Sequence, residues 1–312
     1  MKIIKNHNIG IVMYHYIRPI KKSLYPNLKG LEFNNFKKQI NYFKNKYDIL
    51  NFDDFLEILK TKKIPKKPCI ILTFDDGYID HYNYAFPYLV EKKISGIFYP
   101  PINVIKKSSA LDVNKVHFIL EKQINRDDIL LKINGFLKKK TGKQISDFDF
   151  SKINFSSRYD DKKTVLIKRL LQFYLEKSLR EKLIDYLFKF YVGIDEKKFC
   201  KNLYLTKKNI IEMSKFNMKF GSHGSNHYWW NTLSKSNQEK ELIESRTYFK
   251  KININIENFS VCYPYGSFNL NTLKLMKKHN ISFALTTKVG SINKKNIYNK
   301  YILPRYDTND FI

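Results

Sequence analysis

The stretch Cys69-Ile70-Ile71-Leu72-Thr73-Phe74-Asp75-Asp76-Gly77 decides the fold, because an apolar run leads directly into two carboxylates and a glycine. Such a run is typical of a strand that is buried on both faces of a parallel sheet. In α/β folds the functional site lies at the carboxyl ends of these strands. We therefore expect Asp75 and Asp76 at the mouth of an α/β sheet, where a turn at Gly77 lets both side chains face one cavity.

The rest of the chain carries a matching alternation of strand and helix patterns, which favours a parallel α/β arrangement. Phe33, Phe36, Ile40, Phe43 and Tyr47 recur at helical spacing, and Ser236 with Glu239 has the pattern of a helix capping box. The predicted strands are residues 9–14, 68–74, 94–99, 218–222, 259–263, 283–287 and 301–303.

A second polar motif, His223-Gly224-Ser225-Asn226-His227, follows the predicted strand 218–222. Two histidines four residues apart can share one ion if they lie in a helical turn, and neutral imidazole is a common zinc ligand. Asp76 would complete three ligands and leave a position for water, while Asp75 stays free to accept a proton. Alone, Asp-Asp-Gly is usually a turn. The two motifs together favour a metal site.

These motifs resemble those of a known family. Residues 73–77, residues 221–227 and Tyr263-Pro264-Tyr265-Gly266 are similar, in the same order, to the first three motifs of the polysaccharide deacetylase family, which contains the NodB homology domain and forms carbohydrate esterase family 4. The resemblance implies a distorted (β/α)7 barrel. It also implies that Asp75 is the general base, that Asp76, His223 and His227 bind Zn²⁺ or a similar divalent ion, and that the Tyr265 backbone N–H belongs to the oxyanion site.

The sequence departs from the family pattern at Cys262, where members commonly carry an arginine that orients the catalytic aspartate. Leu303-Pro304-Arg305-Tyr306, at the end of the last predicted strand, resembles the Pro-Arg of branches whose third motif reads Tyr-Pro-Tyr-Gly. We therefore expect Arg305 to hold Asp75. The alternative is a surface arginine near the terminus.

The late histidine that usually protonates the leaving amine is also missing, because no histidine follows His279, which itself is expected at a helix end. His15 closes the first predicted strand, and some branches carry a similar Tyr-His. A catalytic role and a structural, hydrogen-bonded role for His15 both stay open. His7, His81 and His117 have no supporting pattern and are expected on the surface.

Aromatic residues follow the second histidine of the motif, in Tyr228-Trp229-Trp230. Such side chains can stack on the apolar face of a sugar ring or pack at the rim of the barrel. We favour contact with the sugar for Trp229 and packing for Trp230.

Between the third and fourth predicted strands the alternation stops, and residues 104–203 carry long helical patterns. We predict that residues 1–312 form a single barrel that this helical insertion interrupts. The insertion leaves the barrel on the side of the site. It could form a lid over the sugar or a helical buttress on the barrel wall.

Composition bounds the partners and the location of the protein. The chain has 57 Lys and Arg against 29 Asp and Glu, a formal net charge of +28, but the lysines are spread over its whole length. This spread weighs against a nucleic-acid binder and leaves attraction to a phosphate-bearing sugar donor or an anionic membrane surface. Cys69, Cys200 and Cys262 are widely spaced, which favours a reducing compartment. Without a signal-peptide or membrane-span pattern, we expect the cytoplasm.

These observations predict a hydrolase that acts on the carbon–nitrogen bond of a linear amide. We expect it to remove an acetyl or formyl group from an amino sugar, carried on a nucleotide or a lipid, in a cytoplasmic precursor of a cell-surface glycan. The alternative is a catalytically inactive sugar-binding or scaffold protein with the same fold, which Cys262 and the absence of a late histidine would suit. The sequence does not indicate an oligomeric state.

Overall fold

The computed structural model describes residues 4–151 and 157–311, which form two compact units. The first unit comprises Met1–Pro19, Gly30–Ser109 and Cys200–Ile312, and the second comprises Ile20–Lys29 and Ala110–Phe199. The second unit therefore also contains a segment from near the amino terminus, which no sequence pattern indicated. Residues 152–156 of the predicted insertion lie outside the described residues, and its role as a lid or a buttress stays a prediction.

The first unit is built on a curled parallel sheet in the strand order β7-β6-β5-β1-β10-β9-β8, with β4 paired to β5 at one side. A parallel bridge between Ser222 and Val261 links the segment after β7 to β8, so the two ends of the sheet meet. This arrangement confirms the distorted barrel. The strands are β1 (Ile9–Tyr14), β4 (Asp48–Ile49), β5 (Cys69–Asp75), β6 (Ile97–Tyr99), β7 (Lys219–Phe220), β8 (Val261–Cys262), β9 (Ala284–Val289) and β10 (Leu303–Asp307); β2 (Ile17–Arg18) and β3 (Leu31–Glu32) form a separate pair.

The alternation of side chains along the central strands separates the inside of the barrel from its outside. Ile9 and Ile11 of β1 join Cys69 and Ile71 of β5 in one buried cluster that also includes residues of β6, β8, β9 and β10, and this cluster fills the barrel. The intervening residues pack in a second cluster against the helices. Asp75 has the same parity as Cys69 and Ile71, so the period of the strand directs it inward.

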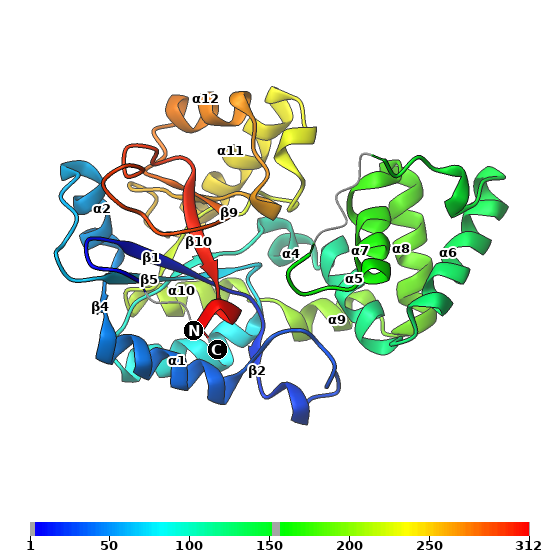
Figure 1. Ribbon diagram of the computed structural model, residues 1–312, viewed down its shortest axis with the longest axis horizontal. Coiled ribbons are helices and arrows are strands. Elements are labelled where there is room, and N and C mark those ends of the chain that lie inside the picture. The colour runs from blue at the N-terminus through cyan, green and yellow to red at the C-terminus, as the bar shows by residue number, and fades with distance from the viewer. Residues whose placement is uncertain (1–3, 152–156, 312) are drawn as a thin grey trace. The chain divides into compact units, whose positions relative to one another are not determined.

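Helices surround these strands, as Figure 1 shows for α1, α10, α11 and α12. Helix α1 covers Phe33–Lys46 and buries Phe36, Ile40 and Phe43, which confirms the predicted helical stripe. The other helices of the first unit are α2 (Phe52–Thr61), α3 (Phe86–Glu91), α4 (Ile102–Lys107), α10 (Lys207–Lys215), α11 (Lys235–Lys251) and α12 (Leu270–Lys278), with a π-helical turn at His81–Ala85 before α3.

Several predicted boundaries are wrong: β6, β7 and β8 are shorter than the predicted 94–99, 218–222 and 259–263, and α11 and β10 also differ. The capping side chain of α11 belongs to Ser234, which accepts a hydrogen bond from the Asn237 backbone N–H, so the helix begins before the expected Ser236. Strand β10 covers Leu303–Asp307, where the sequence predicted 301–303. It continues through Pro304 because the pairing with β9 shifts register between Leu303 and Arg305, so the missing N–H of proline falls at an irregularity. Arg305 consequently lies inside the strand.

The second unit is helical and has its own core, with Val165, Leu170, Leu183 and Leu187 fully or almost fully buried. Its helices are α5 (Asp112–Lys122), α6 (Arg126–Thr141), α7 (Lys162–Arg169) and α8 (Lys177–Tyr191), and α9 (Glu196–Leu203) leads from it back to the first unit. Across residues 4–151 and 157–311, no helix combines the length and the apolar character needed to cross a bilayer.

Candidate metal and catalytic site

Asp75 and Asp76 reach the mouth of the barrel because the backbone turns at once after β5. Asp75 is the last residue of the strand, and Asp76 and Gly77 both adopt left-handed backbone conformations, with φ of 69° and 65°. A Cβ atom at Gly77 would lie 2.5 Å from Cβ of Pro100, so only glycine fits there. The left-handed turn breaks the alternation of the strand and lets the neighbouring carboxylates face the same space.

Three side chains meet at one point of this mouth. The Asp76 Oδ1 atom lies 3.4 Å from Nε2 of His223 and 3.3 Å from Nε2 of His227. Their spacing suggested a helical turn, but the two histidines lie in an irregular loop. Left-handed conformations at Gly224 (φ 70°) and His227 (φ 58°) fold this loop back on itself and bring the two imidazoles to a ring-centroid distance of 4.7 Å.

The donor atoms of this group fit a divalent cation. Asp76 Oδ1 is buried and has no hydrogen-bond partner among the described residues, while Oδ2 accepts a hydrogen bond of 2.7 Å from the Tyr78 hydroxyl. His223 Nδ1 donates to the carbonyl of Cys262 at 2.7 Å, so in the neutral imidazole the lone pair is on Nε2, facing Asp76. Burial raises the pKa of Asp76, but the close imidazoles outweigh burial and hold it well below its usual value. One carboxylate oxygen and two imidazole nitrogens are a common ligand set for a divalent metal ion.

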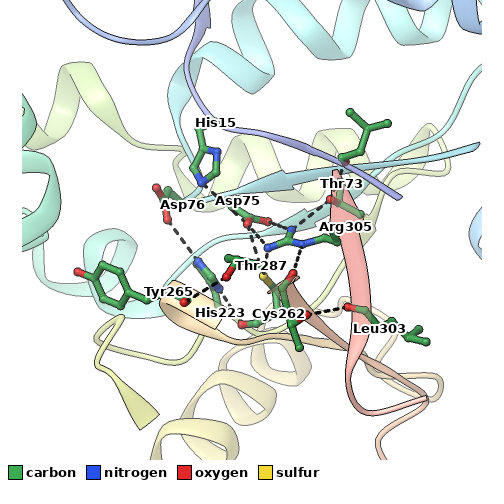
Figure 2. Close-up of polar contacts among 12 residues, drawn as sticks. His15, Thr73, Asp75, Asp76, His223, Cys262, Tyr265, Thr287, Leu303 and Arg305 are labelled. Atoms are coloured by element: carbon green, nitrogen blue, oxygen red, sulfur yellow. Dashed lines mark hydrogen bonds and ion pairs between the residues drawn. The ribbon is translucent and has the colours of Figure 1, made fainter. Parts of the chain in front are cut away.

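Asp75 lies beside this group and is held by Arg305 (Figure 2). The guanidinium Nη1 lies 3.0 Å from Oδ1 and Nη2 lies 2.8 Å from Oδ2, a bidentate arrangement. Arg305 is oriented in turn, because its Nε donates to the carbonyl of Thr286 at 2.9 Å and its Nη1 to Oγ1 of Thr73 at 3.3 Å. The structure thus brings Arg305 to Asp75 as expected, and not to the surface.

Cys262 lies on the other side of the same pair. Its Sγ accepts a hydrogen bond of 3.0 Å from Arg305 Nη2 and donates one of 3.4 Å to Asp75 Oδ2. Burial raises the pKa of the Cys262 thiol, which keeps it neutral and able to donate. Burial also raises the pKa of Asp75, but the charge of Arg305 and the nearby histidines outweigh it and lower the pKa below its usual value. Asp75 is therefore ionised and can accept a proton.

The remaining histidines occupy different environments. His15 follows β1, and its Nε2 lies 4.0 Å from Asp75 Oδ2 with 38% of the side chain exposed, so it borders the site. His81, which the sequence placed on the surface, is fully buried. Its Nε2 lies 2.8 Å from the carbonyl of His15, and its ring packs against Phe74 and Phe98. That prediction was wrong because the π-helical turn directs His81 into the core.

Tyr265 forms the other wall of the site in a left-handed conformation with φ of 58°. Its ring lies 4.6 Å from the His227 ring and stacks on Trp229 at 4.3 Å with an interplanar angle of 8°. Trp229 is half-buried against the Tyr265 ring, whereas Trp230 is fully buried in the core cluster. Trp230 therefore packs in the protein interior.

Two residues that contact Asp75 or Asp76 were not predicted from the sequence. Tyr78 had no expected role, although it directly follows Gly77 and its hydroxyl donates to Asp76. Cys262 was treated as a departure from a pattern, although it contacts both members of the Asp75–Arg305 pair. Adjacency to the motif was the available signal for Tyr78. For Cys262 no local signal existed, because its partners come from β5 and β10.

Comparison with known proteins finds similarity to one family. A family model described as polysaccharide deacetylase matches residues 175–284, a segment that contains His223, His227 and Tyr265. YxkH of Bacillus subtilis (strain 168), provisionally named a polysaccharide deacetylase, is 21% identical over 300 residues, which cover 94% of this chain and 70% of YxkH.

These findings confirm the resemblance to the polysaccharide deacetylase family.

Solved structures of the same fold include the Streptococcus pyogenes deacetylase PplD in complex with acetate, with a TM-score of 0.61, 19% identity and coverage of 97% of this chain and 93% of PplD. A de-N-acetylase from Aggregatibacter actinomycetemcomitans superposes with a TM-score of 0.54 and 14% identity over 96% of this chain and 95% of that one. Polysaccharide deacetylases are hydrolases that act on amide bonds, and the match to their family model supports deacetylase activity.

Proposed function

We propose that this protein is a metal-dependent hydrolase that removes an acetyl group, or a formyl group, from the nitrogen of an amino sugar. One observation carries the proposal: an ionised carboxylate, Asp75, lies beside a separate set of three converging donor atoms from Asp76, His223 and His227. A protein that only binds sugar needs no ionised carboxylate placed beside a separate ion site.

The residues divide the work of amide hydrolysis. Asp76, His223 and His227 would hold the ion, for which we propose Zn²⁺ because the set combines imidazole nitrogen with carboxylate oxygen. An ion bound there supplies a Lewis acid that lowers the pKa of water and polarises an acyl carbonyl. Asp75 takes the proton of the attacking water, and Arg305 keeps that carboxylate ionised and correctly oriented.

Three further residues would contact the substrate. The Tyr265 backbone N–H would donate to the oxygen on which negative charge develops. Trp229, stacked on the Tyr265 ring, offers an aromatic face to the sugar. His15, partly exposed and near Asp75, is our choice for the acid that protonates the leaving amine, because the other histidines near Asp75 are either ligands or buried.

The carrier and the compartment follow from charge and cysteine usage. A net charge of +28 would attract a sugar carried on a nucleotide or lipid phosphate, or an anionic membrane surface. All three cysteines are buried free thiols, which suits a reducing compartment. We therefore propose a cytoplasmic precursor of a cell-surface glycan as the substrate.

Calorimetric titration of zinc into metal-stripped protein, followed by an assay of acetate release from acetylated amino sugars, tests the function. We expect one tight site that disappears in His223→Ala, and acetate release that requires the ion. Zinc binding without release from any acetylated sugar would favour the inactive sugar-binding protein. The absence of a zinc site in the wild type would reject metal dependence.

A further inference from the structure

The loop that carries both histidine ligands lies around a buried carboxylate from another element. Glu241, in helix α11, is only 4% exposed. Its Oε2 accepts hydrogen bonds from the backbone N–H groups of Ser225 at 2.7 Å and Asn226 at 2.8 Å, and its Oε1 accepts one from the Asn226 side-chain amide at 2.5 Å. Its own carbonyl oxygen accepts a further hydrogen bond from Ser225 Oγ at 3.3 Å. Burial raises the pKa of Glu241 above its usual value, and these bonds offset part of that cost of burying the charge.

The backbone approaches this carboxylate so closely that only glycine fits before Ser225. A Cβ atom at Gly224, whose φ is 70°, would lie 2.8 Å from Glu241 Oε2 and 3.2 Å from Nε1 of Trp230. Successive backbone N–H groups that point at one anion form the concave arrangement with which proteins bind phosphates. Here the anion is supplied by the chain itself.

The loop is also held on its opposite side. Asn103, in helix α4, donates from its side-chain amide to Oδ1 of Asn226 at 2.7 Å and from its backbone N–H to the carbonyl of Ser225 at 2.9 Å. The Asn226 amide therefore donates to Glu241 and accepts from Asn103. Rotating the Asn226 side-chain amide by half a turn would face its oxygen toward the Glu241 carboxylate and its NH2 group toward the NH2 group of Asn103. Only the observed orientation therefore satisfies both contacts.

The two ligands differ in how their rings are fixed. His223 is oriented by the hydrogen bond from its Nδ1 to the Cys262 carbonyl. His227 Nδ1 has no hydrogen-bond partner in the described part of the chain. The direction of the His227 ring thus depends on its backbone, which follows Asn226 directly, and on its contact with the Tyr265 ring.

We propose that Glu241 is a positioning residue that fixes the 223–227 loop, so that His227 Nε2 faces Asp76 before any ion binds. The inference rests on the proposed function and deepens it. A loop that is ordered in advance loses little conformational freedom when the ion binds, so affinity is higher than for a mobile loop. Replacing Glu241 by Gln removes the charge and puts an amide donor where an acceptor is required.

Hydrogen exchange of the metal-free protein tests this positioning without reference to activity. We expect the Ser225 and Asn226 amides to be protected in the wild type and to exchange at least about tenfold faster in Glu241→Gln. Glu244→Gln is the matched control, since Glu244 lies one turn further along α11 and, within the described part of the chain, its ion pair with Lys240 at 3.9 Å involves no residue of the 223–227 loop. Equal protection of both amides in the wild type and in Glu241→Gln would overturn the proposal.

Zinc affinity, measured well below the unfolding temperature, separates positioning from simple stabilisation. We expect Glu241→Gln to bind zinc about 10- to 100-fold more weakly and Glu244→Gln to bind as the wild type does. A purely structural role would lower the melting temperature and leave the affinity of the folded protein unchanged.

If Glu241→Gln does not fold, Asn103→Ala serves instead, because it removes only the side-chain contact to Asn226. Unchanged zinc affinity in Asn103→Ala would count against the network. A wild type that binds no zinc would reject the metal-dependent function, whereas equal affinity in wild type and Glu241→Gln would reject the role of Glu241.

Discussion

Arg305 and Asp75 lie 230 residues apart in the sequence and meet through two nitrogen–oxygen contacts, of 3.0 Å for Nη1–Oδ1 and 2.8 Å for Nη2–Oδ2. The pair connects the last strand of the barrel to the strand that carries the proposed base. Its geometry makes the Asp75 carboxylate both ionised and fixed in direction.

Asp75→Asn should remove the proton acceptor and leave the ion site intact, because Asp75 is not among the three converging donors. We expect kcat to fall by about 10²- to 10⁴-fold. Zinc affinity, measured by calorimetry on the same preparation, should stay close to that of the wild type. Substantial acetate release by this variant would refute the role of Asp75 as the base.

Arg305→Lys should lower kcat/KM by about 10- to 100-fold, because an ammonium group cannot reproduce the bidentate contact. Arg305 lowers the pKa of Asp75, so weakening the contact should raise that pKa and move the acid limb of the kcat/KM profile to higher pH. The measurement is the pH dependence of acetate release. A reduced rate with an unshifted acid limb would show that Arg305 does not control the ionisation of Asp75.

Tyr78→Phe removes the hydroxyl that donates to Asp76 Oδ2 at 2.7 Å. Without this bond the carboxylate is free to rotate, and we expect zinc affinity to weaken about tenfold. Calorimetry on metal-stripped protein gives the value. Tyr82→Phe, whose hydroxyl contacts Glu212 instead, is the control and should bind zinc normally.

Gly266→Ala and Gly135→Ala should change stability in opposite directions. A Cβ atom at Gly266, where φ is 68°, would lie 2.8 Å from the Thr287 backbone nitrogen, so we expect a loss of about 1–3 kcal/mol in the free energy of unfolding. Gly135 lies inside helix α6 with nothing within 4 Å, and alanine there should stabilise by about 0.5–1 kcal/mol. Denaturant titration of both variants checks the signs, and a stabilised Gly266→Ala would contradict the described turn.

Acid should destabilise the protein through His81. Burial lowers the pKa of His81 to about 4 in the folded state, against 6.5 as its ordinary value. Between these values the unfolded chain binds a proton that the folded chain does not, so stability falls as the pH drops through this window, by up to about 3 kcal/mol at its lower end.

The check is denaturant unfolding at several pH values for the wild type and for His81→Gln. We expect the free energy of unfolding of His81→Gln to depend much less on pH in this window, whatever its value at neutral pH. His7→Gln, at an exposed position, should keep the pH dependence of the wild type. Equal slopes in the wild type and in His81→Gln would contradict the prediction.

The elements that could be predicted from the sequence are those determined by local patterns. The apolar run before Asp75 indicated a buried strand with a carboxylate at its end, and the stripe of helix α1 followed a helical period. The pairing of Arg305 with Asp75 was expected only through a family resemblance, because no local pattern connects residues so far apart.

The errors concern features that tertiary structure decides. A spacing of four suggested a helical turn for His223 and His227, but left-handed residues and the Glu241 carboxylate impose a loop. His81 is buried because a π-helical turn redirects it, and a π-helical turn has no clear sequence pattern. Residues 20–29 join the helical unit through contacts with much later chain segments, such as that between Lys29 and Asp160, which are 131 residues apart.

The position of β10 has a consequence for how the protein is made. Although it comes last in the sequence among the strands described, β10 lies between β1 and β9 in the sheet. On the ribosome, β1 therefore keeps one hydrogen-bonding edge unpaired until Leu303–Asp307 has been synthesised. The same segment delivers Arg305 to Asp75. A nascent chain thus lacks both a complete sheet and an oriented Asp75 carboxylate, and it gains them in one step once this segment pairs with β1.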